Sequence, residues 1–328
     1  MNRVAQLLLL FCVSTFAQSL YASYLAEIAE KLKRNSFVKL PDNTSLRELD
    51  INYSHFYWAD TAVWDPIRKR ILWVGGPGQC CTKVPRYELI KYLESDNKWA
   101  LEHTPFVKAG HAYDANAYDP DTDTLYFSLF RDRKVKVYKG NKWSTLSTLP
   151  FSAPDASSIT WFPDINEKGA LVYVGANRNI ALYSDRKWQR IIPPSGFSWG
   201  GYHVFSEYNH RHKLVWFGGG KNNDKSHYAL YADGRIKKFS QAPISLGVGK
   251  ALHTYDPLTG NLIVLDLKTK HLWEFNVGKD EWKVIKDVNG AWPPMQKGAW
   301  LAVPINEYNV NLFVNHYHQR RSVYMYKN

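Results

Sequence analysis

Cysteine and long apolar segments are both scarce in this chain of 328 residues. It has three cysteines, and beyond its N-terminal segment no apolar run approaches the roughly 18 to 20 residues that a membrane span requires. The sequence also lacks a Gly-x-Ser-x-Gly elbow, a Walker loop and a dinucleotide-binding fingerprint. These absences argue against an integral membrane protein, a serine hydrolase and a nucleotide-binding enzyme.

The N-terminus carries the one pronounced apolar stretch. In "MNRVAQLLLLFCVSTFAQS", Arg3 precedes an apolar run from Val4 to about Ala17, and small residues follow at a suitable cleavage point. The pattern predicts a secretory signal peptide over residues 1–19, with Cys12 inside it. An N-terminal membrane anchor is the alternative, although the run is short for one. We therefore expect a secreted or periplasmic protein. We also expect it to be a monomer.

Positive charge exceeds negative charge, with 42 Lys and Arg residues against 30 Asp and Glu residues and a net charge of +12. Such a surplus favours anionic partners through long-range attraction. Nucleic acid is a poor candidate for an exported protein in which no basic run is longer than three residues. We expect an acidic polysaccharide or oligosaccharide as the partner, with other cell-surface polymers and anionic lipid headgroups as alternatives, and no cofactor.

A repeat runs along most of the chain. One aromatic residue opens an apolar segment in each of five units, at intervals of 43 to 51 residues: Trp99, Trp143, Trp188, Phe239 and Trp282. An Asp-Pro-type turn precedes each of them, as in "NAYDPDTDTLYF" and "HTYDPLTGNLIVL", and a strand that ends in an aromatic residue lies between. Four short strands per unit at this period are typical of propeller blades; a β-sandwich with accidental spacing is the alternative.

The two ends of the chain complete this pattern. A sixth unit stops at "SVYMYKN", where its fourth strand is due, and "NSFVKLPDN" (residues 35–43) supplies a segment of the missing kind, with Phe37 in the place of the tryptophans. We predict an all-β fold, a six-bladed β-propeller of four-stranded antiparallel blades over residues 35–328, closed by the N-terminal strand 35–43. Closure removes the open sheet edges. Residues 20–34 are expected to form an arm or short helix.

The repeat resembles the kelch repeat. The resemblance rests on glycine pairs after the second strand (Gly75-Gly76 and Gly218-Gly219), a tyrosine on the third strand and a tryptophan that opens the fourth. Two of the six units carry the glycine pair, and the Asp-Pro turn is more regular. Kelch-like propellers include sugar oxidases, sialic-acid epimerases, polysaccharide lyases and interaction modules, so the resemblance implies an architecture and leaves the function open.

The first strand of each blade lines the channel of a propeller, so positions counted back from the turn identify the residues at one channel entrance. Positions six and eight before the turn share a strand face. They include Tyr57, His111, Tyr113, Asp155, His203, Lys250 and Trp300. Because unpaired polar groups are costly to bury, we expect a ligand site at this channel mouth. Mutual hydrogen bonding around a watery channel is the alternative for any one residue.

Three classes of function fit this mouth. In the first, it binds an acidic glycan, with Trp199, Tyr202 and Trp300 as stacking platforms and His253 among the binding residues. In the second, the protein is a polysaccharide lyase that acts by β-elimination. The third is a protein-interaction scaffold, for which we expect an apolar patch on the outer loops.

The lyase hypothesis assigns catalytic roles at the mouth. Tyr113, with His111 or His203, would remove the proton beside a uronate carboxylate, and Lys250 would neutralise that carboxylate. The histidines at 111, 203 and 253 could instead bind a metal. These three histidines are not joined by a short His-x-His or His-x₃-His spacing, so we predict no metal site.

The remaining cysteines, Cys80 and Cys81, are adjacent in the glycine-rich segment "GGPGQCCTK". In an oxidising compartment two lone cysteines on one loop are expected to bond to each other. Neighbouring Cα atoms lie about 3.8 Å apart, below the usual disulfide range of roughly 4.4 Å and more, so the ring is strained. We predict a structural vicinal disulfide that borders the site; a free pair or a metal site is the alternative. A copper-radical oxidase, which needs a tyrosine–cysteine crosslink, is disfavoured.

Overall fold

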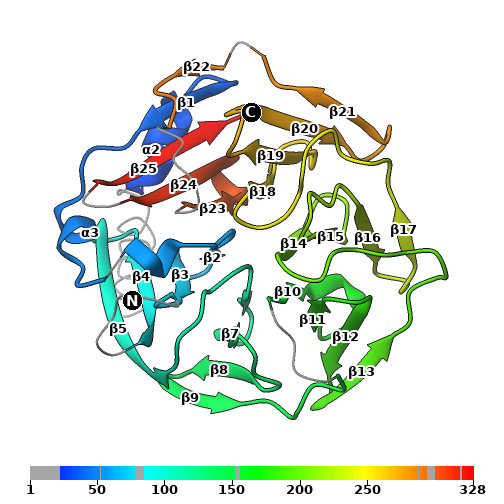
Figure 1. The fold of residues 1–328 in the computed structure, drawn as a ribbon. Helices are drawn as coiled ribbons and strands as arrows, with labels where there is room; N and C mark the ends of the chain where they lie inside the picture. The colour runs from blue at the N-terminus through cyan, green and yellow to red at the C-terminus, as the bar shows by residue number, and fades with distance from the viewer. Residues whose placement is uncertain are drawn as a thin grey trace, which may run out of the picture.

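Six β-sheets stand in a ring around a central axis (Figure 1). The structure is a computed structural model that describes residues 23–51, 53–78, 85–151, 156–286, 288–293, 300–317 and 320–328. The chain passes through the six sheets, blades 1 to 6, in sequence order, and the first strand of each blade lies nearest the axis (Figure 1). The predicted six-bladed β-propeller is confirmed.

Blades 1 to 5 each contain four antiparallel strands that follow one another from the axis outward. Blades 1 and 2 consist of β2 (Val63–Asp65), β3 (Arg70–Gly75), β4 (Arg86–Leu93) and β5 (Lys98–Val107), then β6 (Asn116–Asp119), β7 (Thr124–Ser128), β8 (Val135–Lys139) and β9 (Lys142–Thr145). Blade 3 consists of β10 (Ser158–Phe162), β11 (Ala170–Gly175), β12 (Asn179–Ser184) and β13 (Lys187–Ile191). Blades 4 and 5 consist of β14 (Val204–Asn209), β15 (Leu214–Gly219), β16 (His227–Tyr231) and β17 (Ile236–Lys238), then β18 (Ala251–Tyr255), β19 (Leu262–Asp266), β20 (Leu272–Asn276) and β21 (Glu281–Val284).

Blade 6 joins the two ends of the chain. Its strands, from the axis outward, are β23 (Trp300–Ile305), β24 (Val310–Tyr317), β25 (Arg320–Lys327), β1 (Ser36–Lys39) and β22 (Asn289–Gly290). Strand β1 runs antiparallel to β25, with Phe37 opposite Tyr326, and parallel to β22. The predicted closure by the N-terminal strand is therefore confirmed, and β22 makes the closing sheet mixed.

The Asp-Pro-type markers form the turns between the first and second strands. Asp65 Oδ1 accepts hydrogen bonds from the backbone N–H groups of Ile67 and Arg68, both at 3.1 Å. Asp256 uses its two carboxylate oxygens in the same way on the N–H groups of Leu258 and Thr259. An Asp or Asn side chain that accepts from the backbone two and three residues on stabilises a tight turn. This local chemistry explains why the marker recurs once per blade.

An aromatic pair joins the third and fourth strands of most blades. The ring centroids lie 4.6 to 5.1 Å apart in the pairs Tyr92–Trp99, Tyr138–Trp143, Tyr183–Trp188, Phe275–Trp282 and Tyr326–Phe37. Paired aromatic rings on neighbouring strands stabilise a sheet beyond their buried area. The regular spacing of the tryptophans in the sequence arises because each one makes this cross-strand contact in its own blade.

Blade 4 departs from the expected pattern. The backbone N–H of Tyr231 donates to the carbonyl oxygen of Arg235, and the Arg235 guanidinium lies 4.6 Å from the centre of the Tyr231 ring. A guanidinium over an aromatic face is attractive, so Arg235 replaces the tryptophan. The prediction that Phe239 takes this place is wrong: Phe239 follows β17 and is buried beside His227 and Phe275.

The helical segments are short and lie mainly at the seam between blades 6 and 1. They are α2 (Tyr24–Lys31), α3 (Thr44–Glu48) and the 3₁₀ turns η1 (Tyr53–Phe56), η2 (Pro163–Ile165) and η3 (Asn306–Tyr308). In the part of the chain that the structure describes, no helix has the length and apolar character needed to cross a membrane. Helix α2 lies within the segment 20–34, where the sequence suggests an arm or short helix.

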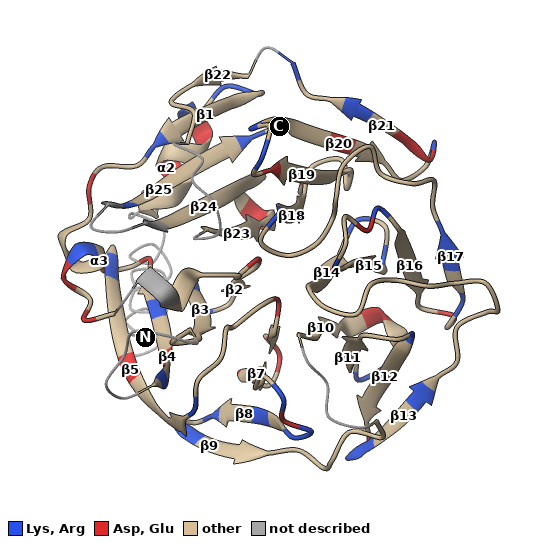
Figure 2. Cartoon of the chain, viewed as in Figure 1, with Lys and Arg blue, Asp and Glu red and all other residues tan. Residues whose placement is uncertain are grey.

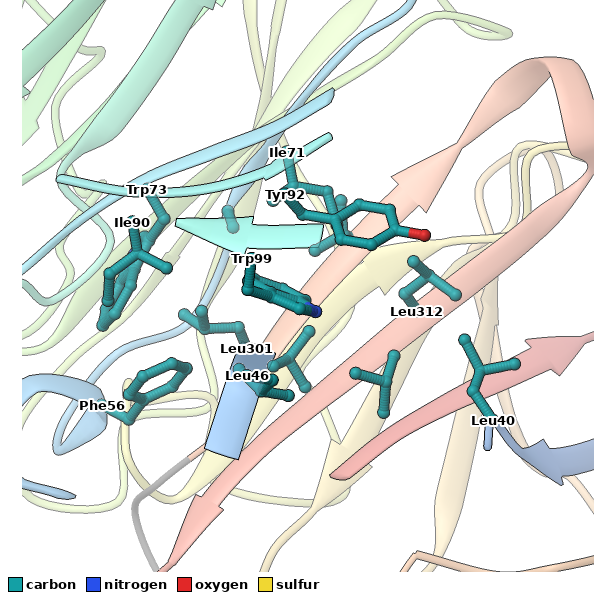
Figure 3. Close-up of a cluster of buried hydrophobic side chains, with 14 of the residues drawn as sticks. Leu40, Leu46, Phe56, Ile71, Trp73, Ile90, Tyr92, Trp99, Leu301 and Leu312 are labelled. Atoms are coloured by element: carbon teal, nitrogen blue, oxygen red, sulfur yellow. The ribbon is translucent and has the colours of Figure 1, made fainter. Parts of the chain in front are cut away.

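The largest apolar cluster fills the seam between blades 6 and 1. Figure 3 shows Leu46 of α3 with Tyr92 and Trp99 of blade 1 and Leu312 of blade 6 in this cluster. Helix α2 adds Leu25, which is fully buried. The N-terminal segment therefore stabilises the ring closure through apolar packing as well as through strand pairing.

The Phe37 side chain tests the contribution of this closure to stability. Phe37 is 2% exposed and packs against Trp292, Phe313 and Tyr326. We expect Phe37→Ala to lower the free energy of unfolding by about 3 to 5 kcal/mol, because it leaves a cavity in the closing sheet. Urea unfolding monitored by tryptophan fluorescence measures the change. Ile192→Ala, at an apolar side chain that is 82% exposed, should change it by less than about 0.5 kcal/mol. Equal effects of the two variants would contradict a structural role for the closing strand.

Candidate functional site

An aromatic and histidine cluster covers the channel at the end where the first strands begin. Segments just before β2, β6 and β14 contribute Trp58, Tyr113 and His203. The ring centroids of Trp58 and His203 lie 4.6 Å apart, and those of Tyr113 and His203 lie 5.4 Å apart. Because blades 1 and 4 are on opposite sides of the ring, Trp58 reaches across the axis (Figure 1).

The backbone at this mouth holds an unusual conformation. Trp58, Tyr113 and His203 have φ angles of 58°, 52° and 61°, in the left-handed region that non-glycine residues seldom adopt. Gly249 of blade 5 also has a positive φ angle, and a Cβ atom at this position would lie 2.0 Å from the Trp58 ring. Side chains larger than glycine at 249 would therefore displace Trp58. Strained backbone of this kind is often found at binding sites.

Two histidines of the mouth are neutral at physiological pH. Burial, together with the nearby His111, Lys250 and Lys221, lowers the pKa of His203 to about 4. Burial also lowers the pKa of His111 to about 4. The Nδ1 atoms of both rings are buried without a hydrogen-bond partner among the described residues. Neither Nδ1 atom is therefore held by another protein group among the described residues, and in a neutral imidazole this atom can donate or accept.

Lysines lie beside the mouth. Lys250 is exposed and donates to Asn223 Oδ1 at 2.6 Å, and Lys221 lies 5.5 Å from the centre of the Tyr202 ring. A groove of about 690 Å³ between blades 4 and 5 adjoins Lys250 and is also lined by Lys225 and Lys268. Figure 2 shows that Lys and Arg also occupy the outer strands β13, β17 and β21. The positive charge is therefore spread over the outer rim as well as the mouth.

The groove also contains one carboxylate, which accepts hydrogen bonds from the backbone and from a hydroxyl group. Asp266 is 8% exposed, and its oxygens accept hydrogen bonds from the backbone N–H of Lys268 at 2.9 Å and from the hydroxyl of Thr269 at 2.6 Å. Hydrogen bonds of this kind hold the carboxylate inward. Because three lysines and this one carboxylate are the charged residues that line the groove, its net charge is positive.

The structure brings six of the predicted site residues together at the mouth. They are Tyr57, His111, Tyr113, Tyr202, His203 and Lys250. Three residues that were not predicted from the sequence also touch this group: Trp58, Phe130 and Lys221. Trp58 falls between the two counted positions of its strand, and the neighbouring aromatic Tyr57 was the signal that could have found it.

Three other predicted site residues lie in the interior. Trp300 is fully buried between blades 5 and 6, and Trp199 is 5% exposed and donates its indole N–H to the carbonyl of Gly175 at 2.8 Å. Their rings therefore offer no face on which a sugar could stack. His253 is fully buried below the mouth, where its ring stacks on Phe205 at 3.8 Å.

Three further predicted residues, Asp155, Cys80 and Cys81, lie outside the described residues. The three histidines of the metal alternative do not converge, because His253 Nδ1 lies 2.6 Å from Asp60 Oδ2 while His111 and His203 are at the mouth. Over the described ranges, no group of three or more His, Cys, Asp or Glu residues is arranged to hold a metal ion.

The polar interior of the channel holds the blades in register below the mouth. Asp114 of blade 2 accepts hydrogen bonds from Thr61 of blade 1, from the Ser158 hydroxyl of blade 3 at 2.6 Å and from the Ser206 backbone N–H of blade 4 at 2.6 Å. Burial and the nearby Asp60 raise the pKa of Asp114, these hydrogen bonds oppose the shift, and the resulting pKa is about 7. One side chain therefore connects four blades and fixes the positions of the mouth residues.

Comparison with known proteins supports the fold alone. No protein-family model matches the chain, and no curated protein matches its sequence. A protein of unknown function from Bacteroides thetaiotaomicron aligns with a TM-score of 0.51 at 15% identity, over 82% of this chain and 70% of that one. A chain of the nidogen–laminin complex aligns with a TM-score of 0.49 at 14% identity, over 69% and 79% of the two chains. The protein YjhT gives a TM-score of 0.48 at 12% identity, over 69% and 83%.

The lowered pKa of His203 predicts how acid affects stability. In the unfolded state the His203 side chain has a pKa of about 6.5, whereas in the folded state its pKa is about 4. The unfolded state therefore binds more protons between these pH values, so His203 makes stability fall as the pH drops from about 6.5 to about 4. His203→Gln removes this dependence. Between pH 7.5 and pH 4, the wild-type protein should lose about 1 to 2 kcal/mol of unfolding free energy relative to the variant.

Urea unfolding of both proteins at the two pH values measures this difference. The raised pKa of Asp114 acts in the opposite sense and is common to both proteins, so it cancels in the comparison. A parallel pH dependence of the two proteins would show that His203 is not held neutral in the fold.

Proposed function

We propose that the protein is an extracytoplasmic binding protein that holds an acidic carbohydrate at the channel mouth. The observation that supports this most directly is the groove lined by Lys225, Lys250 and Lys268 beside the aromatic cluster of Trp58 and Tyr202. Acidic sugars present carboxylate or sulfate groups to cations and apolar ring faces to aromatic side chains. The mouth and the groove together supply both kinds of contact.

The spatial arrangement also favours recognition of an extended chain. The groove extends from Lys250 to Lys268 between blades 4 and 5, while Lys221 and Tyr202 lie at the mouth. A single monosaccharide would use only part of these features. We therefore propose a polymer or oligosaccharide with repeated negative charges as the ligand.

Glycan binding should depend on salt and on Lys250. Screening shortens the Debye length from about 10 Å at 0.1 M salt to about 3 Å at 1 M, so the affinity for a uronate polymer should fall over this range. Lys250→Gln should weaken binding roughly three- to fivefold at 0.1 M salt, since one exposed charge pair contributes up to about 1 kcal/mol. Calorimetry with polygalacturonate and with a neutral polymer of similar length measures both effects.

Lys187→Gln provides the matched control, because Lys187 is exposed on the outer strand β13 and carries the same charge. It should leave the affinity unchanged within about twofold. Equal losses in the two variants would mean that the net charge alone attracts the polymer. No retention of any acidic glycan at low salt, by a folded protein, would refute the proposal.

A polysaccharide lyase is the second candidate, and the state of His203 favours it. A neutral imidazole with an unpartnered Nδ1, beside the Tyr113 ring and close to Lys250, has the components for proton abstraction next to a uronate carboxylate. In this scheme His203 or Tyr113 takes the proton and returns it to the leaving glycosidic oxygen as the C4–O bond breaks, and Lys250 stabilises the carboxylate as negative charge develops on it.

Absorbance near 235 nm distinguishes the two candidates, because β-elimination creates an unsaturated uronate end. If the protein is a lyase, Tyr113→Phe should reduce turnover by about 10² to 10⁴-fold and leave binding nearly unchanged. Phe130→Leu, a change of an apolar neighbour of Tyr113, controls for packing effects. Binding without an absorbance change identifies a recognition protein instead.

An interaction scaffold has less support. The large apolar side chains exposed in the described residues, Ile67, Val107, Ile192 and Leu258, lie in three different blades. They do not form the contiguous patch that a docking surface usually presents.

Three further features belong to this proposal. We propose that the repeat is kelch-like, since the glycine pairs lie at the ends of β3 and β15 and an aromatic pair joins the third and fourth strands. Export through a signal peptide at residues 1–19 and a bond between Cys80 and Cys81 stay predictions, because they concern residues outside the described ranges.

A further inference from the structure

A second cavity opens at the other end of the channel, where the first strands end. It has a volume of about 250 Å³ and reaches inward to Thr160 and Glu207 on the first strands of blades 3 and 4. Rings from different blades form its walls: Trp64, Tyr118, Trp161, Tyr208 and Tyr255. The cavity is separate from the mouth and its lysine-lined groove.

Glu207 lies at the inner end of this cavity without a partner. Glu207 is 8% exposed, and both of its carboxyl oxygens are buried with no hydrogen-bond donor among the described residues. The neighbouring carboxyl groups differ: Asp60 contacts His253, and Asp114 accepts from Thr61 and two further groups. Burying a carboxyl group without a donor is costly, so this arrangement indicates that a donor arrives from outside.

The basic residues near the rim are already paired. Arg70 contacts Asp65 and Asp123, and Lys69 contacts Glu307 at 2.6 Å. The titratable groups that act on Glu207 are the carboxyls of Asp60 and Asp114, and these together with burial raise its pKa well above the usual range. No basic side chain forms an ion pair with Glu207 in the part of the chain that the structure describes.

We propose that this cavity binds a primary ammonium group, and that the Glu207 carboxyl turns toward the cavity to accept hydrogen bonds from it. An ammonium group supplies the donors and the positive charge that the site lacks. The surrounding rings favour a cation and the alkyl chain that carries it. An anion would supply no hydrogen-bond donor to Glu207, and a neutral alcohol would supply a donor without the charge.

A free amine and a lysine side chain of another protein share this chemistry. The two sources differ in size, because a lysine must carry its backbone to the rim formed by Pro66, Pro120 and Pro304. Butylamine and a blocked lysine, Nα-acetyl-lysine methylamide, therefore serve as probes for the two sources. 1-Butanol is the neutral control of equal chain length.

Calorimetry on the wild-type protein tests the proposal first. Butylamine should bind at least about tenfold more tightly than 1-butanol. Because an ammonium group favours the ionised form of Glu207, binding should release up to one proton, which appears as a dependence of the heat on the ionisation enthalpy of the buffer. Equal binding of amine and alcohol, or no binding of either, would overturn the proposal.

Glu207→Gln keeps the shape of the side chain and removes its ionisation. It should reduce butylamine binding roughly tenfold or more and abolish the proton release. Glu88→Gln is the matched control, since Glu88 is also buried but lies on β4 and already contacts His103 at 2.9 Å. It should leave amine binding unchanged. Unaltered binding to Glu207→Gln would place the amine elsewhere, and binding of butylamine without the blocked lysine would restrict the site to free amines.

Discussion

The pairing of β1 with β25 is the constraint on which the propeller depends. A ring of sheets whose last blade lacked its outer strand would expose an edge that could pair with other chains. The N-terminal strand covers that edge, and Phe37 repeats opposite Tyr326 the aromatic contact that tryptophans make in four other blades. Closure also fixes the diameter of the channel. The mouth, whose residues come from opposite blades, can assemble only in a closed ring.

The architecture could be predicted because each blade repeats the same local chemistry. Asp65 and Asp256 mark turns through hydrogen bonds to the next few residues, and such signals are visible in a single sequence. The prediction failed in blade 4, where Arg235 replaces the tryptophan opposite Tyr231. Arginine and tryptophan side chains both stack on an aromatic ring, but a charged arginine does not belong to a pattern of aromatic residues. The aromatic spacing in the sequence therefore points to Phe239, the next aromatic residue along the chain.

The site was predicted less completely, because strand length varies among the blades. Counting back from the turn finds Tyr113 and His203 in the segments just before β6 and β14, but β23 already begins at Trp300. The equivalent position in blade 6 therefore lies within a strand, and its side chain packs between the blades. Trp58 has a left-handed backbone conformation, and its ring packs against Gly249 of another blade. Such long-range contacts leave no local pattern in the sequence.

The interior of the channel separates two ends of opposite character. Neutral histidines and lysines surround the mouth, whereas the unpartnered carboxyl of Glu207 lies at the inner end of the other cavity. Between them, Asp114 joins four blades and Asp60 contacts His253, so the centre is filled by a bonded polar network. Because that network leaves Glu207 out, the unfavourable burial of this carboxyl persists in the free protein. A cation that binds there would reduce this cost and would act at a distance from any acidic ligand at the mouth.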